Sequence, residues 1–219
     1  MNRRHATAAL IAAGFAPAAW AQGGPVEGRH YLRLGQPLAT TPGKIDVIEF
    51  FFYMCPHCNA FDPLLESWVR QLPADVNFRR VPVGQNLMLK LHQRMYYALE
   101  AMGALTPQVH AGIFNAFHRQ RVEAQDEAAI TGLVGKLGVD TAKFKAAFNS
   151  FGVQTKVSQG MKLAEAAGVD SVPALVVAGR WRTGPGEAGT PGQNELAQGQ
   201  AALAVADFLI KQARGGKTS

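Results

Sequence analysis

The feature that most constrains this chain is an apolar run that leads into two closely spaced cysteines. Residues 45–53 are mostly Ile, Val and Phe, a composition typical of a strand buried on both faces of a sheet. Cys55 follows at once, and Phe61 and Leu65 then recur at the spacing of one helical face. A second strand is predicted at residues 76–83. Strand, helix and strand together indicate a right-handed crossover unit of a parallel sheet.

Four further helices are predicted between residues 87 and 151. Residues such as Thr106 and Asp140 are suited to cap their N-termini. In the last of the four, we expect Phe151 on the inner face, directly before a terminating Gly152. These helices predict a helical subdomain set into the crossover fold.

The C-terminal part predicts a return to the sheet. A fifth helix, at about residues 153–167, precedes a strand at 174–177 and a hairpin return at 180–182. A loop rich in Gly and Pro, residues 184–192, leads to a last helix at about 195–213.

The first 21 residues have the pattern of a secretory signal peptide. Arg3 and Arg4 supply positive charge, and a stretch of small and apolar residues runs from Ala6 to Ala19. Ala19-Trp20-Ala21 fits a cleavage site, so we expect cleavage after Ala21 and an exported, periplasmic protein. A buried N-terminal helix is the alternative, which the proline within the segment and the glycines after it disfavour.

Composition narrows the partners and the chemistry. The net charge of +6 comes without a long basic run, which disfavours nucleic acid as a partner. No apolar run reaches the about 18 residues of a membrane-spanning helix, so we expect a soluble mature protein. The chain has only two cysteines, which cannot by themselves close a structural zinc site. Because they would close almost no loop, a disulfide between them would stabilise little, so chemistry explains the pair better.

The two cysteines are placed for thiol chemistry. Cys55 lies where a strand ends and a helix begins, so amide groups and the helix dipole favour its thiolate. His57 adds a hydrogen-bond donor, and a positive charge when protonated. Cys58 lies one turn into the helix, so we expect an exposed Cys55 to be attacked and an inner Cys58 to close the disulfide. A strongly lowered Cys55 pKa would make the disulfide a good oxidant.

Glu49 is the one acidic residue in the middle of the first apolar strand. A carboxylate there costs free energy unless it is paired or protonated. One hypothesis is that Glu49 lies beneath the cysteines and relays the proton of Cys58. The alternative is a structural ion pair with Arg79 or Arg80 on the next strand.

Two segments resemble a known family. Residues 47–58, which include the motif C-P-H-C, resemble the active-site strand of the DsbA thiol:disulfide interchange proteins, and residues 168–174 are similar to that family's Val–cis-Pro loop. The resemblance covers nearly all of the mature chain. It implies an α/β protein with a thioredoxin fold in residues 22–86 and 152–219 and an inserted helical subdomain in residues 87–151.

The resemblance also implies roles for the residues of the site. Cys55 would be the nucleophile and Cys58 the resolving cysteine, His57 would tune the thiolate, and Pro56 would complete the catalytic motif. Glu49 would be the buried acid.

The same resemblance implies how substrates and partners are engaged. Val172 and Pro173, joined by a cis bond, would contact the substrate backbone. The protein would donate its disulfide to reduced exported proteins and be reoxidised by a DsbB-type membrane oxidase that passes electrons to quinone. No organic cofactor is expected, because the Cys55–Cys58 disulfide is itself the redox group. The short segment between the cleavage site and the first strand favours a monomer over the dimeric isomerases.

Two other functions stay open from the sequence. A periplasmic disulfide reductase of the same fold is the nearer one, and the His at the third motif position argues against it. The other is a redox-inert peptide-binding module or chaperone that keeps a structural disulfide.

Overall fold

The sheet has five strands, and both cysteines lie just after the strand at residues 45–51. The computed structural model describes residues 23–216, so the predicted signal peptide lies outside the described residues. The strand order is β1-β5-β4-β2-β3; β2 and β3 are parallel, and β4 is antiparallel to both β2 and β5. The strands are β1 (Leu32–Arg33), β2 (Ile45–Phe51), β3 (Val76–Pro82), β4 (Ala174–Val177) and β5 (Trp181–Thr183).

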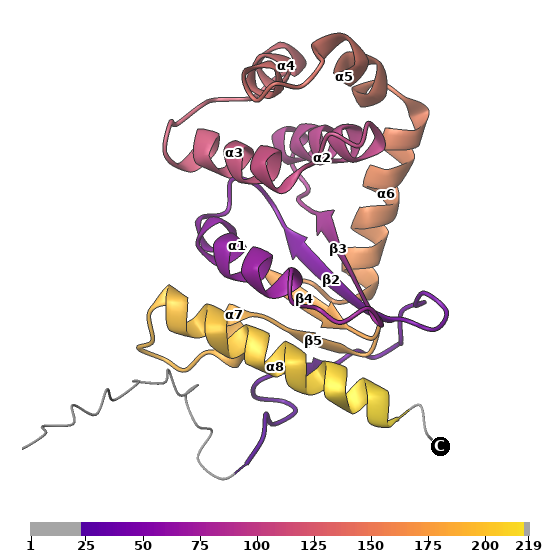
Figure 1. Cartoon of the computed structure of the whole chain (residues 1–219), viewed down its shortest axis with the longest axis vertical. Helices are drawn as coiled ribbons and strands as arrows, with labels where there is room; N and C mark the ends of the chain where they lie inside the picture. The colour runs from indigo at the N-terminus through magenta and orange to yellow at the C-terminus, as the bar shows by residue number, and fades with distance from the viewer. Residues whose placement is uncertain (1–22, 217–219) are drawn as a thin grey trace, which may run out of the picture.

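Some of the helices form a separate layer, and others pack against the two faces of the sheet. Figure 1 shows α2 to α5 gathered at one end of the molecule, with α6 running from this layer along the sheet. The helices are α1 (Pro56–Val69), α2 (Leu87–Ala101), α3 (Pro107–His118), α4 (Glu127–Lys136), α5 (Thr141–Phe148), α6 (Phe151–Ala166), α7 (Pro185–Ala188) and α8 (Glu195–Gly215).

Strand β2 carries the core because all seven of its residues are buried. Its side chains alternate between the two faces of the sheet. Ile45 and Val47 pack with residues of α1 and α8, whereas Ile48 and Phe50 pack with residues of α6. Burial of each such side chain contributes about 1.5–3 kcal/mol. By the same alternation Glu49 faces α1, the helix that carries both cysteines.

Local capping signals account for the helix starts. Thr106 accepts a hydrogen bond from the Val109 amide at the start of α3, and Asp140 accepts from Ala142 and Lys143 at the start of α5. Such caps satisfy amides that have no partner within the helix. Both predicted starts are therefore confirmed.

Two expectations about the connections are wrong. Phe151 was expected on the inner face before a terminating Gly152, but α5 ends at Phe148 and Phe151 begins α6 with an exposed fraction of 82%. Ser150 causes the break, because its hydroxyl caps the new helix by accepting from the Val153 amide. The loop at residues 184–192 also contains α7, a short helix that begins at Pro185.

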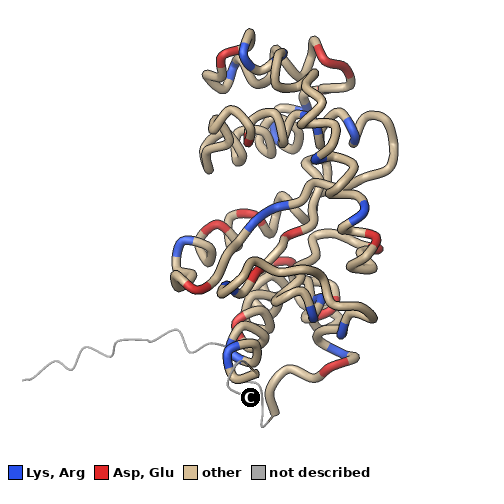
Figure 2. Tube along the Cα trace, turned by 90° about the vertical axis from the view of Figure 1, so that its right-hand side faces the viewer, with Lys and Arg blue, Asp and Glu red and all other residues tan. Residues whose placement is uncertain are grey.

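The described part of the chain carries charges of both signs. Basic and acidic residues are interspersed along the trace in Figure 2. Among residues 23–216, no helix combines the length and the apolar character needed to cross a membrane.

Candidate active site

Cys55 is the N-cap residue of α1, so its sulfur lies at the positive end of the helix. Cys55 Sγ accepts a hydrogen bond from the Cys58 amide at 3.2 Å. Both cysteines are free thiols, and Cys58 is fully buried. Cys55 was expected to be exposed, but its exposed fraction is only 3%. The carbonyl of Val172 explains this, because it approaches Cys55 Sγ to 3.6 Å.

The two thiols differ sharply in acidity. The pKa of Cys55 is lowered from 9.0 to about 7, chiefly by a hydrogen bond from the Cys58 thiol. Burial opposes this change, while the amides of Cys58 and His57 and the charge of His57 support it. Burial raises the pKa of Cys58 far above its ordinary value. The thiolate of the reduced pair therefore forms on Cys55.

His57 is turned toward the last helix rather than buried beside the sulfur. Its ring is largely exposed, and Nδ1 lies 2.5 Å from Glu195 Oε1 in the first turn of α8. Pro56 occupies the first turn of α1, where its missing N–H costs nothing. Sequence reasoning missed Glu195, which lies 138 positions from His57.

The loop before β4 faces the cysteines, as expected. The Val172–Pro173 bond is cis, and this loop supplies the carbonyl that contacts Cys55. A cavity of about 230 Å³ beside this loop is lined by Phe61, Pro173 and Glu195, among others. Val172 lines both this cavity and the larger groove described next.

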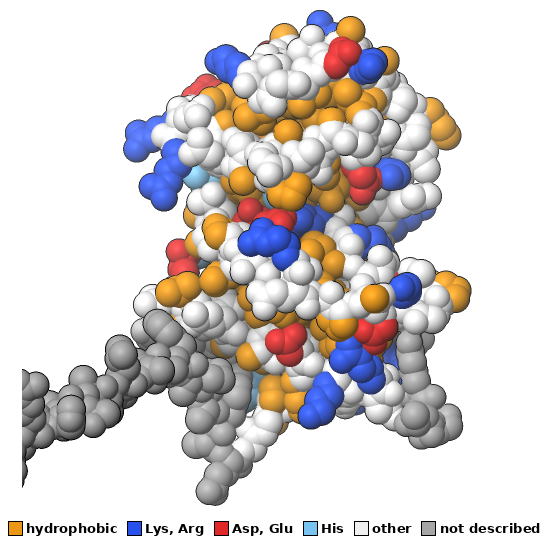
Figure 3. All heavy atoms as spheres, viewed as in Figure 1, with side chains coloured by type: hydrophobic (Ala, Val, Ile, Leu, Met, Phe, Trp, Pro, Cys, Tyr) orange, Lys and Arg blue, Asp and Glu red, His pale blue; other side chains and the backbone are white. Residues whose placement is uncertain are grey.

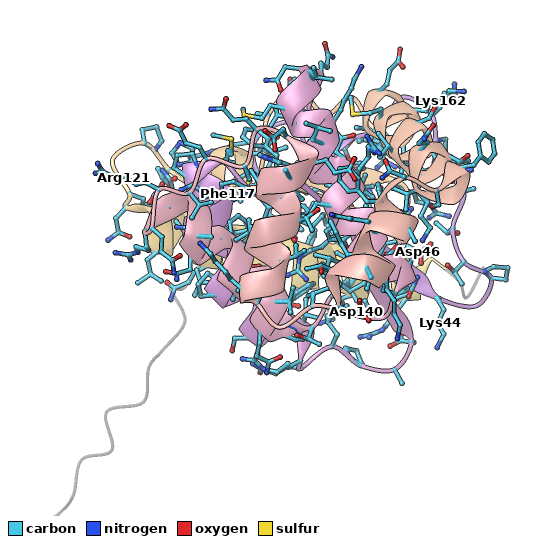
Figure 4. The ribbon with its side chains drawn as sticks, turned by 90° about the horizontal axis from the view of Figure 1, so that it is seen from above. Lys44, Asp46, Phe117, Arg121, Asp140 and Lys162 are labelled. Atoms are coloured by element: carbon cyan, nitrogen blue, oxygen red, sulfur yellow. The ribbon has the colours of Figure 1, made fainter. Side chains whose placement is uncertain are left out.

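A wide groove leads away from Cys55. Its volume is about 1220 Å³, and its walls include Val172, the segment before α2 and one side of α6. Val157 and Met161 supply apolar surface, and Lys162 supplies a positive charge. Viewed from above, Lys162 on α6 and Phe117 on α3 lie on opposite sides of the helical layer (Figure 4). The groove therefore follows the α6 side of the molecule.

Glu49 belongs to a buried cluster of charges centred on Arg80. Arg80 Nε donates to Glu49 Oε2 at 2.7 Å, and Arg80 Nη2 lies 3.3 Å from Asp62 Oδ1 and 2.9 Å from Glu66 Oε1. The predicted ion pair is thus present, with Arg80 and not Arg79. A cavity of about 320 Å³ reaches this cluster from the surface. In Figure 3, acidic and basic side chains meet between α1 and α3.

Glu49 is coupled to the inner cysteine by charge. Burial raises the pKa of Glu49 to about 7, against the opposing charge of Arg80. The charge of Glu49 in turn contributes to the raised pKa of Cys58, after burial and Cys55. A carboxyl that titrates near neutral pH beside a thiol is suited to exchange a proton with it.

Residues 23–216 contain four histidines outside the motif. Each makes a hydrogen bond: His30 with the Val26 amide, His92 with the Ala124 carbonyl, His110 with the Tyr53 hydroxyl and His118 with the Tyr53 carbonyl. A histidine in an amphipathic helix gives no sequence signal of its partner.

Comparison with known proteins agrees with this geometry. Residues 46–203 match the DSBA-like thioredoxin domain family. The chain is 43% identical over 215 residues to the thiol:disulfide interchange protein DsbA of Bordetella parapertussis, with 97% of each chain covered. It is 39% identical over 189 residues to DsbA of Pseudomonas aeruginosa, with 85% of each covered.

Solved structures give the same result. The crystal structure of Pseudomonas aeruginosa DsbA has a TM-score of 0.82 and 34% identity, covering 89% of this chain and 97% of that one. DsbA of Xylella fastidiosa has a TM-score of 0.74 and 28% identity, covering 87% and 98%. With two cysteines held at the start of α1 against a cis-proline loop, the chain belongs to the DsbA family of thioredoxin-fold thiol:disulfide oxidoreductases.

Proposed function

We propose that this protein oxidises pairs of thiols in exported proteins by donating the disulfide of Cys55 and Cys58. The observation that carries the proposal is the position of Cys55 at the N-terminus of α1, with a thiol pKa lowered to about 7 by the Cys58 thiol and nearby amides. A stable thiolate favours the reduced form, so the disulfide form is a good oxidant. The same thiolate is a good leaving group.

The reaction is two successive thiol–disulfide exchanges. A substrate thiolate attacks Cys55 Sγ of the disulfide, which breaks the Cys55–Cys58 bond, forms a mixed disulfide and releases the Cys58 sulfur to take up a proton. A second substrate thiolate then attacks the substrate sulfur of the mixed disulfide and expels the Cys55 thiolate. The substrate loses two electrons and the protein gains them.

Glu49 is proposed to exchange the proton of Cys58. Cys58 is fully buried and has a raised pKa, so the sulfur released in the first exchange needs a nearby proton donor. Glu49 faces α1 and titrates at about pH 7. Its ion pair with Arg80 holds the carboxyl in place, so the structural and the relay interpretations are compatible.

The substrate is proposed to bind across the loop at Val172 and Pro173 and along the groove. Extended backbone can pair with the exposed groups of such a loop, and apolar side chains can enter the groove beside Met161. The groove is large enough for several residues of an extended peptide. Pro56 and His57 line the same groove next to Cys55.

The location and the reoxidant follow from this role. We propose export to the periplasm with cleavage after Ala21, and action as a monomer. Reoxidation is assigned to a DsbB-type membrane oxidase, the partner that membership of the DsbA family implies. The disulfide carries the electrons, so no organic cofactor is required.

Trapping of the mixed disulfide tests the proposal. The oxidised protein is mixed with a reduced test protein that carries two cysteines, and both partners are followed by thiol alkylation and mass spectrometry. Stoichiometric oxidation of the test protein is expected, and Cys58→Ser should accumulate a mixed disulfide through Cys55. Cys55→Ser should form none. Oxidation that persists in Cys55→Ser would contradict the assignment of the nucleophile, and net reduction of an oxidised test protein would favour a reductase.

A further inference from the structure

Tyr53 is held at both ends by one helix of the helical layer. Its carbonyl accepts from His118 Nε2 at 2.8 Å, and its hydroxyl lies 2.8 Å from His110 Nδ1. Both histidines belong to α3, about two turns apart. Figure 1 shows the loop from β2 to α1 passing beneath α3. We name Tyr53, His110 and His118 together the histidine clamp.

The clamp consists of one buried hydrogen bond, at the Tyr53 hydroxyl, and one part-buried hydrogen bond, at the Tyr53 carbonyl. A carbonyl only accepts, so His118 Nε2 must donate. Tyr53 is fully buried, and burial raises its pKa well above 10.0, which keeps the hydroxyl protonated. Burial lowers the pKa of His110, which keeps that ring neutral. With the Tyr53 hydroxyl donating to Nδ1, the remaining proton of His110 lies on Nε2.

The clamp also reaches the helix of the cysteines. His110 Nε2 lies 3.2 Å from Asp62 Oδ1, and Asp62 lies on α1, one turn beyond Cys58. Tyr53 itself is two residues before Cys55, in a loop whose Phe52 carbonyl accepts from the Cys55 amide at 3.0 Å. Helix α3 is therefore hydrogen-bonded to the loop before Cys55, and its His110 ring lies against the helix after it.

We propose that His118 and His110 are positioning residues that hold Cys55 at the N-terminus of α1 and thereby favour the dithiol form. In the disulfide form a covalent bond keeps Cys55 Sγ beside Cys58. In the dithiol form, the sulfur is kept there by the Cys58 amide and by the position of the loop. The clamp therefore stabilises the dithiol form more than the disulfide form, and it makes the disulfide more oxidising. The inference rests on Cys55 and Cys58 being the redox pair.

The primary test is His118→Ala, with two readouts. The equilibrium with glutathione should shift away from the dithiol form by up to about fivefold, which is the full effect of one lost hydrogen bond. Urea unfolding of both redox forms should show a larger loss of unfolding free energy for the dithiol form. The difference between the two losses should correspond to the shift in the glutathione equilibrium. If the hydrogen bond is purely structural, its loss should lower the free energy of unfolding of both redox forms equally and leave the glutathione equilibrium unchanged.

His92→Ala is the matched control. His92 is another histidine of the helical layer, more deeply buried than His118, and its Nε2 lies 2.8 Å from the carbonyl of Ala124. It loses the same kind of bond away from the cysteine loop, so both redox forms should lose the same stability. His118→Gln, whose amide can donate to the Tyr53 carbonyl, should restore much of the glutathione equilibrium.

Tyr53→Phe keeps the test valid if His118→Ala does not fold. It keeps the ring and the carbonyl and removes only the hydroxyl bond to His110, so a smaller shift in the same direction is expected. If His118→Ala and Tyr53→Phe both leave the glutathione equilibrium of the wild type unchanged, the clamp has no redox role. If the wild-type protein itself does not exchange with glutathione, the proposed function fails instead.

Discussion

The amide of Cys58 donates a hydrogen bond to Cys55 Sγ across 3.2 Å, so the first turn of α1 stabilises negative charge on Cys55. Cys55 needs no distant partner for this stabilisation, because the Cys58 amide, the Cys58 thiol and the His57 amide all belong to one turn of the chain. The oxidising character proposed for the protein therefore depends on where the motif lies in the fold.

The stability of the reduced protein should depend on pH through Cys55. Its pKa is lowered from 9.0 to about 7 in the folded protein, chiefly by the Cys58 thiol. A lowered pKa gives stability that is fully present above pH 9.0 and is lost as pH falls through about 7. Urea unfolding of the reduced protein, relative to Cys55→Ser, should show this rise between pH 7 and 9. A constant difference over that range would contradict the lowered pKa.

Removal of the motif histidine should weaken the thiolate. In His57→Ser, we expect the pKa of Cys55 to rise by only a small part of its total shift, because the charge of His57 is the smallest of the effects that lower it. The pH dependence of Cys55 alkylation by iodoacetamide measures this. Glu195→Gln keeps the imidazole and removes only its carboxylate partner, so it should change the Cys55 pKa less. An unchanged alkylation profile in His57→Ser would exclude a role for the ring.

Glu49→Gln should slow the step in which Cys58 gains or loses its proton. Proton transfer by a placed carboxyl is worth on the order of a hundredfold, and Glu49 titrates at about pH 7. Rapid-mixing kinetics of exchange at several pH values should therefore show a slower rate and the loss of a titration near neutral pH.

Glu66→Gln is the control for Glu49→Gln. Glu66 also contacts Arg80, at 2.9 Å, but its side chain is more exposed than that of Glu49. The exchange rate of Glu66→Gln and the pH dependence of that rate should stay close to those of the wild type. The relay hypothesis is lost if Glu49→Gln behaves in the same way as Glu66→Gln.

Arg80 should be essential to stability. Arg80→Met leaves the carboxylates of Glu49, Asp62 and Glu66 without their shared cation, which typically costs about 3–5 kcal/mol of unfolding free energy for a buried pair. Arg214→Met is the control, because Arg214 pairs with Asp75 on the surface and should matter far less. Urea unfolding of the oxidised proteins compares them. Equal losses in the two variants would contradict the importance of the buried cluster.

The order of strands and helices could be predicted because its signals are local. The apolar composition of β2 reflects burial on both faces, and Asp140 caps a helix that starts at the next residue. Where a local signal is weak the prediction fails. The Ser150 cap is followed at once by apolar Phe151, which sequence periodicity assigns to the preceding helix.

The contacts of the site could be predicted only in part. Cys55, Cys58 and Pro173 are recognisable from their motifs, and Arg80 was one of two candidates for Glu49 because neighbouring strands bring the two residues into register. His118 and Tyr53 lie 65 positions apart, and their hydrogen bond depends on how α3 packs over the loop. No pattern within either segment indicates such a partner.

The reduction potential of the Cys55–Cys58 pair tests the central claim most directly. The mature protein is equilibrated in glutathione buffers of known ratio, and the two redox forms are separated after thiol trapping. A potential of about −180 mV or more oxidising, at or above that of protein disulfide isomerase, is predicted for a pair with a stabilised Cys55 thiolate. A value near the −270 mV or so of thioredoxin would contradict the oxidase function and identify the protein as a reductase.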